Sequence, residues 1–376
     1  MTTAPFSSLA TDNRLSSSEF LSTVDASVVD IFCGVGGLSH GMKLEDFSIA
    51  CGIDLDEECR YAYEKNNDAP FIRMDVSDLS GRFLNEHFHS GTYRILAGCA
   101  PCQPFSIYNQ KNDDPQWQLL SEFGRLVDEA RPHVVTMENV PRLAKFRNGE
   151  AFDNFIQALE KADYHIWWKP VFCPEYGVPQ NRTRLVLLAS RLGPIGLEPP
   201  THAPDGFVRV GDVISRLPPL EAGGVNPADP FHCASRLSPT NLKRIRESKP
   251  GGSWREWPEE LVTDCHRRET GRGYTSVYGR MSWDEPSPTI TTQFYGFGNG
   301  RFGHPDQDRA LSLREGAILQ TFPEDYAFVE PGRTIHFKRV GKMIGNAVPV
   351  LLGRAIARSI RRHLEESVRG RKDQIP

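Results

Sequence analysis

Two residues that could perform covalent chemistry lie where two successive strands are expected to end. Cys102 is in the run 101–104, Pro-Cys-Gln-Pro, and Glu138 follows the apolar residues 134–137. In an α/β sheet the carboxyl ends of such strands line one crevice, so the thiol and the carboxyl can meet over one substrate atom. The pair indicates covalent catalysis, in which a soft nucleophile attacks while an acid stabilises a nitrogen that gains electrons.

Other roles for this cysteine are possible. A cysteine beside a buried strand is most often a small core residue. Pro101 and Pro104 favour catalysis, because they make a stiff turn that is costly unless the thiol must be held in place. Cys99 and Cys102 also form a C-x-x-C pair. The chain has no second such pair and no thioredoxin-like context, so a nucleophile is favoured over a zinc or redox site.

The elements that must position this pair begin with a strand at 28–32, a glycine-rich turn at 33–37 and a helix from Leu38. Glycines let a backbone approach a ligand closely, although the spacing does not fit the dinucleotide motif G-x-G-x-x-G. A strand at 48–53 leads to Asp54, and Asp75 follows 71–74. Either acid could simply cap the next helix. A glycine turn and two acids at three strand ends together favour an adenosine-bearing ligand.

Composition limits the protein class. The 376 residues are 39% apolar and carry a net charge of −4, which suits a large globular core in one or two domains. The chain has no run of about 18 apolar residues, so the sequence predicts no membrane span. Residues 1–27 are rich in Ser and Thr and are expected to be a disordered tail. The eight cysteines show no disulfide framework, which fits a cytoplasmic protein.

The segment 236–280 is locally basic. It holds ten Lys or Arg and six Asp or Glu, interleaved with Trp254, Trp257, Tyr274 and Tyr278. This mixture is expected where phosphates are neutralised and bases or sugars are packed, although a solvated basic face is the simpler alternative. His232-Cys233 and Cys265-His266 could form a zinc site, but their separation is unusual, so we expect no metal.

The organisation of the chain changes after a Pro- and Gly-rich stretch at 193–219. Residues 206–335 contain short segments and many turn formers, whereas the apolar residues from Val348 to Ile360 recur at helical spacing. We therefore predict an α/β fold with a Rossmann-like domain made of 28–205 and 336–376, and a smaller, irregular domain at 206–335.

A series of motifs resembles that of the cytosine carbon-5 DNA methyltransferases. The motifs are Asp30-Ile31-Phe32-Cys33-Gly34-Val35-Gly36-Gly37, Pro101-Cys102-Gln103, Glu138-Asn139-Val140, Gln180-Asn181-Arg182-Thr183-Arg184, Leu319-Gln320-Thr321-Phe322-Pro323 and Gly345-Asn346-Ala347-Val348-Pro349. Their order and spacing over about 28–360 are more specific than any single motif. The resemblance implies a Rossmann-like domain that binds S-adenosylmethionine, a target-recognition domain at 206–335, and a last helix beside the first strand.

The resemblance also implies the roles of individual residues. The catalytic residues would be Cys102, Glu138, Arg182 and Arg184, with both arginines projecting to one face. S-adenosylmethionine would contact Phe32, Gly34, Val35, Asp54, Leu55, Asp75, Val76, Pro101, Leu119 and Asn346, with the ribose on Asp54 and the adenine near Leu55, Asp75 and Val76. The DNA substrate would contact Gln103, Ser106, Asn139 and Gln180.

The chemistry follows from the electronics of cytosine. Carbon-5 is a poor nucleophile until a thiolate, here from Cys102, adds at carbon-6. Glu138 would hold N3 and the exocyclic amine, and a raised pKa would help it. A stacked base cannot be reached, so the cytosine must be rotated out of the duplex, and the polar segment 106–118 is expected to close over it.

The sequence therefore predicts an enzyme that forms 5-methylcytosine at a short duplex sequence. A restriction-modification role with a cognate restriction endonuclease, and a monomeric cytoplasmic enzyme, fit its size. Two alternatives remain: an RNA (tRNA) cytosine methyltransferase, and a non-catalytic relative that binds DNA and regulates. The sizeable variable region favours DNA, and the intact Cys102, Glu138 and Arg182 favour an enzyme. The recognised bases do not follow from the sequence.

Overall fold

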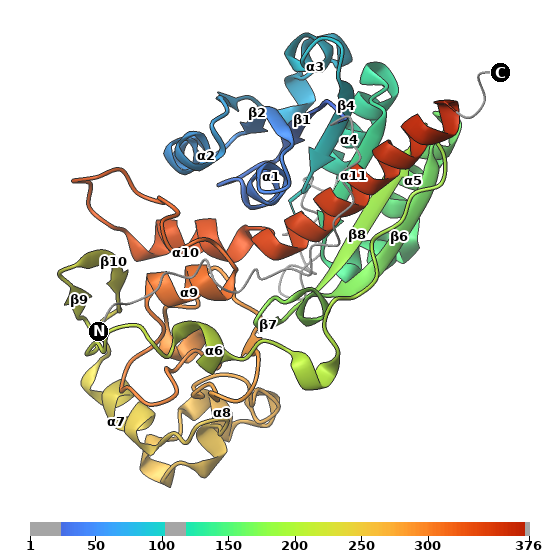
Figure 1. The fold of residues 1–376 in the computed structure, drawn as a ribbon. Helices are drawn as coiled ribbons and strands as arrows, with labels where there is room; N and C mark the ends of the chain where they lie inside the picture. The colour runs from blue at the N-terminus through green and yellow to red at the C-terminus, as the bar shows by residue number, and fades with distance from the viewer. Residues whose placement is uncertain (1–23, 102–117, 373–376) are drawn as a thin grey trace.

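The computed structural model describes residues 24–101 and 118–372, and within them it shows a seven-stranded sheet (Figure 1). The strand order is β3 (Phe71–Arg73), β2 (Ser48–Asp54), β1 (Ala26–Ile31), β4 (Tyr93–Gly98), β5 (Val134–Asn139), β8 (Thr183–Ser190) and β6 (His165–Phe172). β8 runs antiparallel to both of its neighbours, and the pairs from β3 to β5 are parallel. This arrangement agrees with the predicted α/β class.

Both faces of the sheet are buried. Successive side chains of a strand point to opposite sides, so neighbouring residues of one strand belong to different apolar clusters. Val28 belongs to an apolar cluster with residues of α1 (Gly37–Lys43) and α11 (Val350–Lys372). Val29 belongs to a second cluster with α3 (Gly81–His87), α4 (Gln118–Ala130) and α5 (Glu150–Lys161). The helices therefore cover the sheet as two layers, and the carboxyl ends of β1, β2, β4 and β5 are left at one rim.

The last helix shares an apolar cluster with Val28 of β1. Its direct partner is α1, and the two helices approach so closely that a Cβ on Gly41 would lie 2.6 Å from the carbonyl carbon of Gly353. The chain from Phe337 to Gly370 is long and apolar enough to span a membrane by composition, but 72% of its apolar window is buried inside the molecule. It therefore serves as core packing that returns the C-terminal part of the chain to the sheet.

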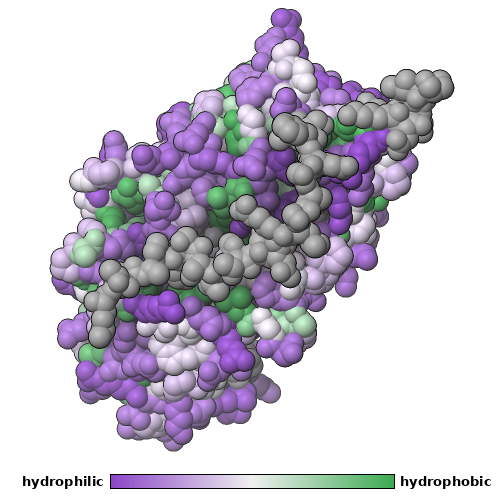
Figure 2. Space-filling view, viewed as in Figure 1, coloured by the Kyte–Doolittle hydropathy of each residue, from purple (hydrophilic) through white to green (hydrophobic). Residues whose placement is uncertain are grey.

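The region 206–335 consists of short elements. The helices are α6 (Val210–Ile214), α7 (Pro239–Glu247), α8 (Asp264–Arg267) and α9 (Leu313–Leu319), and the strands are β9 (Val225–Asn226), β10 (Asp229–Cys233) and β11 (Ser287–Pro288). β11 pairs with β7 (Gln180–Asn181), directly before β8, and α10 (Phe337–Asn346) lies between this region and the sheet (Figure 1). The face in Figure 2 is mostly hydrophilic, with small scattered apolar patches.

A buried ion pair organises the start of α9. Arg309 donates to both carboxylate oxygens of Glu315 at 2.7 Å, and Glu315 also accepts the backbone amide of the helix cap, Ser312. Burial acts to raise the pKa of Glu315, but the bonds from Arg309 prevail and lower the pKa to about 2. The carboxylate is therefore charged at neutral pH and holds the first turn of α9 in place.

The aromatic residues of the basic segment are not all available to bind nucleic acid. Trp254 and Trp257 are each only 6% exposed and pack in an apolar cluster with Ile245 and Phe297, so the prediction that they contact bases or sugars is wrong. Their indole nitrogens are also used internally, by the Tyr274 carbonyl and the Ser248 hydroxyl. The region is small, and its large rings are needed to build its core.

Candidate active site

A cavity of about 540 Å³ opens at the carboxyl ends of β1, β2, β4 and β5. Most of the expected site residues line it, from segments far apart in the sequence: Phe32, Gly34, Val35, Asp54, Leu55, Asp75, Val76, Pro101, Leu119, Glu138, Asn139, Arg182, Arg184 and Asn346. Cys102, Gln103 and Ser106, and the segment 106–117 expected to close over the base, lie outside the described residues. Gln118 is the first residue of α4.

The glycine-rich turn after β1 forms one wall of this cavity. Phe32, Gly34 and Gly36 all have positive φ angles, of 57°, 52° and 87°. A Cβ added to Gly34 would meet nothing within 4 Å, whereas one on Gly36 would lie 2.3 Å from the Asn67 side chain. Gly34 therefore leaves its backbone open to a ligand, and Gly36 permits close packing behind the turn.

Asp54 ties this turn to the end of β2. Its carboxylate accepts the amides of Gly34, at 2.8 Å, and Asp56, at 2.9 Å. Burial raises the pKa of Asp54, and these two amide bonds act against the rise. Each carboxylate oxygen keeps a lone pair, so the side chain can still accept a hydrogen bond from a ligand hydroxyl.

The second acid, Asp75, does cap a helical turn. Its Oδ1 accepts the backbone amide of Ser77 at 2.9 Å and the Ser77 hydroxyl at 2.7 Å. The neighbouring Val76 is buried, while Leu55 is 57% exposed although it lines the cavity. The wall between β2 and β3 thus offers a carboxylate next to apolar surface, an arrangement that suits a flat, partly polar ring.

Glu138 is the penultimate residue of β5 and lies beside Arg184 from the neighbouring strand β8. The Arg184 Nε is 2.9 Å from Glu138 Oε1, and their side chains are 13% and 8% exposed. Burial raises the pKa of Glu138, while the charges of Arg184 and Arg182 act to lower it. A carboxyl with a raised pKa keeps its proton to a higher pH than a free glutamate and can serve as a proton donor.

Arg182 has different surroundings from Arg184. It is 2% exposed, and its Nη atoms donate to the carbonyls of Ile290, Gly345 and Ala347 at 3.0 to 3.4 Å. The residue lines the cavity, but these bonds make it a link between β8, the residues after β11 and the end of α10. Arg184 therefore forms an ion pair with Glu138, and the charge of Arg182 also acts on Glu138.

Gln180 also belongs to this internal link. It is fully buried and absent from the cavity lining, and its amide donates to the Leu319 carbonyl and the Gln320 side chain. Its Oε1 accepts the Ile290 amide at 2.8 Å. The expected DNA contact of Gln180 is thus replaced, in this structure, by contacts within the protein.

Asn139 joins the end of β5 to the residues that precede Cys102. Its Nδ2 donates to the Ala100 carbonyl at 2.9 Å, and its Oδ1 accepts the Val140 amide at 2.8 Å. Both ends of the amide are engaged in a side chain that is 2% exposed. Asn139 therefore holds the Ala100 backbone, two residues before Cys102, beside the end of β5.

Several residues of the cavity were not expected from the sequence. Asp30, the residue before the end of β1, accepts a 2.6 Å hydrogen bond from Ser39, and burial raises the pKa of Asp30 to about 7. Its place just before the glycine turn was the available signal.

Two ion pairs join α10 to the chain after β2 at the cavity wall. They are Arg339–Glu58 and Lys342–Asp56, each at 2.7 Å. Their partners are too far apart in sequence for spacing to reveal them.

Comparisons with known proteins give the family. Residues 26–362 match the model of the C-5 cytosine-specific DNA methylases. The chain is 54% identical over 339 residues to the type II methylase M.HgiDII of Herpetosiphon aurantiacus, covering 90% of this chain and 96% of that protein. It is 31% identical over 338 residues to the type II methyltransferase M1.HphI of Haemophilus parahaemolyticus, covering 88% and 86%.

Solved structures agree in fold. A putative DNA modification methyltransferase from an Escherichia coli prophage superposes with a TM-score of 0.67 at 21% identity, covering 90% of this chain and 99% of that one. The Entamoeba histolytica methyltransferase EhMeth gives 0.62 at 14% identity over 90% and 99%. With the cavity, its strand-end acids and the family match together, the chain belongs to the C-5 cytosine-specific DNA methylases and is a DNA (cytosine-5-)-methyltransferase that uses S-adenosylmethionine.

Proposed function

We propose that this enzyme methylates a cytosine within one short duplex sequence, with Cys102 as the nucleophile, Glu138 as the acid and Arg184 as the residue that orients Glu138. The observation that carries the proposal is the position of Glu138. It lies beside Arg184, has a raised pKa and lines the same cavity as the glycine turn and the two strand-end acids. Methyl transfer needs this proximity of a base-binding acid and a cofactor wall.

The cavity fits S-adenosylmethionine, which when bound supplies a methyl group on a positively charged sulfur. The open side of Gly34 leaves room for a ligand against the backbone, and the Asp54 carboxylate has lone pairs to accept ribose hydroxyls. Leu55 offers exposed apolar surface for the adenine, and Asp75 lies close by to accept from its amine. The remaining expected contacts, among them Phe32, Val76 and Asn346, line the same cavity.

The proposed reaction begins with addition of the Cys102 sulfur to carbon-6 of the cytosine. The electron pair of the C5–C6 double bond then moves to C4–C5, and the C4–N3 pair moves onto N3, which takes a proton from Glu138. Carbon-5 has become electron-rich and takes the methyl group, whose bonding pair stays on the cofactor sulfur, while the C4–N3 double bond re-forms and N3 returns its proton to Glu138. Solvent then takes the proton from carbon-5, the C5–H electron pair restores the C5–C6 double bond, and the C6–S bond breaks with its pair left on Cys102 as a thiolate.

The surroundings of Glu138 suit this step. A protonated carboxyl is needed before N3 becomes basic, and burial favours that neutral form. Once the proton has moved, the carboxylate is stabilised by Arg184, whose Nε lies 2.9 Å away. The site thus has an acid before the transfer and a paired anion after it, with little rearrangement of the protein.

We assign duplex binding to the region 206–335. Eight basic side chains of the segment 236–280 are exposed and available to neutralise phosphates: Arg236, Lys243, Arg246, Lys249, Arg255, Arg267, Arg268 and Arg272. Tyr274 is 55% exposed beside Arg272. The same segment builds its core from Trp254 and Trp257. We therefore propose that it contacts DNA through these exposed basic side chains and through its exposed loops.

The two relatives named above are called type II enzymes, and we propose that this chain, too, is the modification enzyme of a restriction-modification system, acting as a monomer at the site of a cognate endonuclease. The test is methylation of a random-sequence duplex library by the purified protein, with the modified cytosines mapped, beside an equal quantity of tRNA. Modification of one short duplex motif supports the proposal. Modification confined to RNA, or scattered over all cytosines, contradicts it.

A further inference from the structure

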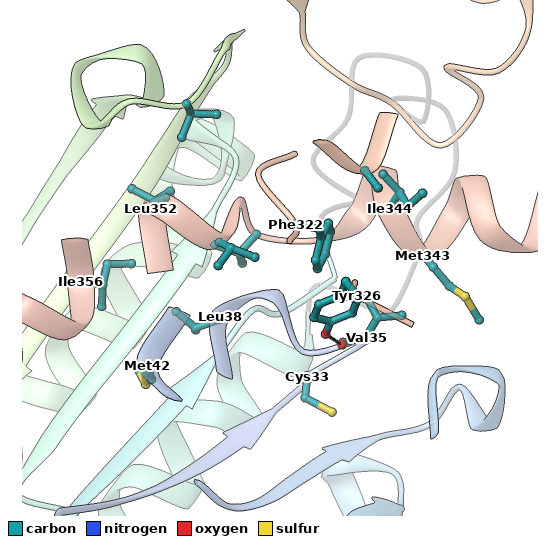
Figure 3. Packing of buried hydrophobic residues seen from close by; sticks show 14 of the residues in the cluster. Cys33, Val35, Leu38, Met42, Phe322, Tyr326, Met343, Ile344, Leu352 and Ile356 are labelled. Carbon is teal, nitrogen blue, oxygen red and sulfur yellow. Dashed lines mark hydrogen bonds between the residues drawn. The ribbon is translucent and has the colours of Figure 1, made fainter. Parts of the chain in front are cut away.

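A hydrogen bond joins the cofactor turn to a distant part of the chain. The Tyr326 hydroxyl donates to the carbonyl of Val35, 291 residues away in sequence (Figure 3). Val35 lies between Gly34 and Gly36 in the turn after β1 and lines the cavity. Tyr326 itself is absent from the cavity lining among the residues the structure describes, so it acts on the cavity only through the backbone of the turn.

The Tyr326 ring is held firmly from several sides. It is 3% exposed and contacts His40 of α1 edge-on, with ring centroids 5.1 Å apart, together with Phe322 at 4.5 Å and Phe328 at 5.0 Å. Burial raises the pKa of Tyr326, so its hydroxyl stays protonated and remains a donor. The sticks in Figure 3 show it pointing at Val35 next to Cys33.

The backbone after Tyr326 is fixed as well. The Asn66 side chain, near the end of α2 (Arg60–Asn67), donates to the Ala327 carbonyl at 3.0 Å and accepts the Ala327 amide at 3.0 Å. Because these two bonds fix the residue after Tyr326, they limit how far Tyr326 can move relative to Val35. The ring, the hydroxyl and the following peptide therefore form one rigid support behind the cofactor wall.

The turn needs such a support because its backbone is unusual. Positive φ angles at Phe32, Gly34 and Gly36 give its peptides orientations that neither a strand nor a helix would fix. The Gly34 amide is held by Asp54, and the Gly36 amide by the Cys33 carbonyl. The bond from Tyr326 orients the Val35 peptide between them.

We propose that Tyr326 is a positioning residue for cofactor binding. By fixing the Val35 carbonyl, it keeps the cavity wall in the conformation that S-adenosylmethionine binds, and it makes cofactor affinity depend on the segment 322–328. The proposal rests on the assignment of the 32–36 turn to the cofactor.

The test compares Tyr326→Phe with Tyr164→Phe. Tyr164 is a matched control, because it is 6% exposed and donates its buried hydroxyl to the Pro132 carbonyl at 2.6 Å, remote from the turn. Calorimetry should show S-adenosylmethionine binding to Tyr326→Phe about five- to tenfold more weakly, the usual effect of losing one buried hydrogen bond. At saturating cofactor, kcat and the KM for DNA should stay within about twofold of the parent protein.

Two further variants keep the result decisive. Asn66→Ala loosens the Ala327 anchor without touching the hydroxyl and should weaken cofactor binding in the same direction. Unchanged cofactor affinity in both Tyr326→Phe and Asn66→Ala, or an equal loss in Tyr164→Phe, overturns the inference. Gly34→Ala directs a methyl group into the cavity and should weaken binding more than tenfold. If Gly34→Ala has no effect, the cofactor assignment of the turn is itself wrong.

Discussion

Arg184 and Glu138 form an ion pair between adjacent strands, with 2.9 Å between Arg184 Nε and Glu138 Oε1. β5 and β8 are antiparallel and pair Glu138 with Val186, and Arg184 lies two residues before Val186 in β8. The pairing is therefore set by strand register rather than by a flexible loop. Burial raises the pKa of Glu138, and the positive charge of Arg184 acts in the opposite direction.

The first prediction concerns the effect of Arg184 on the pKa of Glu138. Arg184→Met removes the positive charge that lowers the pKa of Glu138, so the pKa should rise further. Because the protonated carboxyl is the active form, the decline of kcat/KM as pH increases should move to higher pH. A pH profile of single-turnover methylation measures this shift. If the decline of kcat/KM at high pH stays at the same pH or moves to lower pH, Glu138 is not the titrating acid.

Replacing the acid itself should remove catalysis while sparing the cofactor. Glu138→Gln keeps the size of the side chain but cannot give a proton to N3, so kcat should fall about 10²- to 10⁴-fold. Binding of S-adenosylmethionine should change by less than about threefold, as measured by calorimetry. A variant that retains more than about a tenth of the parent activity would exclude Glu138 as the proton donor.

A third prediction tests the link from Asn139 to the backbone that precedes Cys102. Asn139→Ala removes the 2.9 Å bond to the Ala100 carbonyl, two residues before Cys102. We expect kcat to fall at least about tenfold, because small displacements of a reacting group are costly, with cofactor affinity retained. Asn181→Ala is the control, since Asn181 makes a comparable bond to the Pro286 carbonyl on the surface. Equal effects of the two changes would contradict a positioning role.

Asp30 should make stability depend on pH. Burial raises the pKa of Asp30 from its ordinary value of 3.8 to about 7 in the folded protein. The unfolded chain therefore loses this proton first as pH rises, and the folded state loses stability between those two values. Asp30→Asn removes this dependence and can still accept from Ser39. Relative to the parent, its free energy of unfolding should rise by up to about 4 kcal/mol from pH 4 to pH 7. Denaturant titrations at several pH values measure it, and a constant difference across that range would argue against a raised pKa.

Much of the catalytic half could be predicted because its signals are local. The strands before Phe32 and Asp54 are short apolar runs, and the glycines between them are needed where φ is positive. The strand-end acids then follow from the geometry of a parallel sheet. The expected cofactor residues consequently line one cavity.

Contacts between distant segments could not be predicted in the same way. Alternation along a strand placed Arg182 and Arg184 on one face, but it did not show that Arg182 would be used by carbonyls of Ile290, Gly345 and Ala347. The bond from Tyr326 to Val35 and the ion pairs from α10 depend on the complete packing. In the basic segment, composition suggested nucleic-acid contacts for Trp254 and Trp257, which the small core needs instead.

The central claim is that a sulfur–pyrimidine bond forms at Cys102. The most direct measurement is mass spectrometry of the enzyme after incubation with S-adenosylmethionine and a duplex that carries 5-fluorocytosine at the mapped target, since fluorine cannot leave as a proton does. The account predicts a stable adduct between one enzyme and one duplex, located on Cys102 and absent in Cys102→Ala. An adduct on another residue, or one that persists in Cys102→Ala, would contradict it.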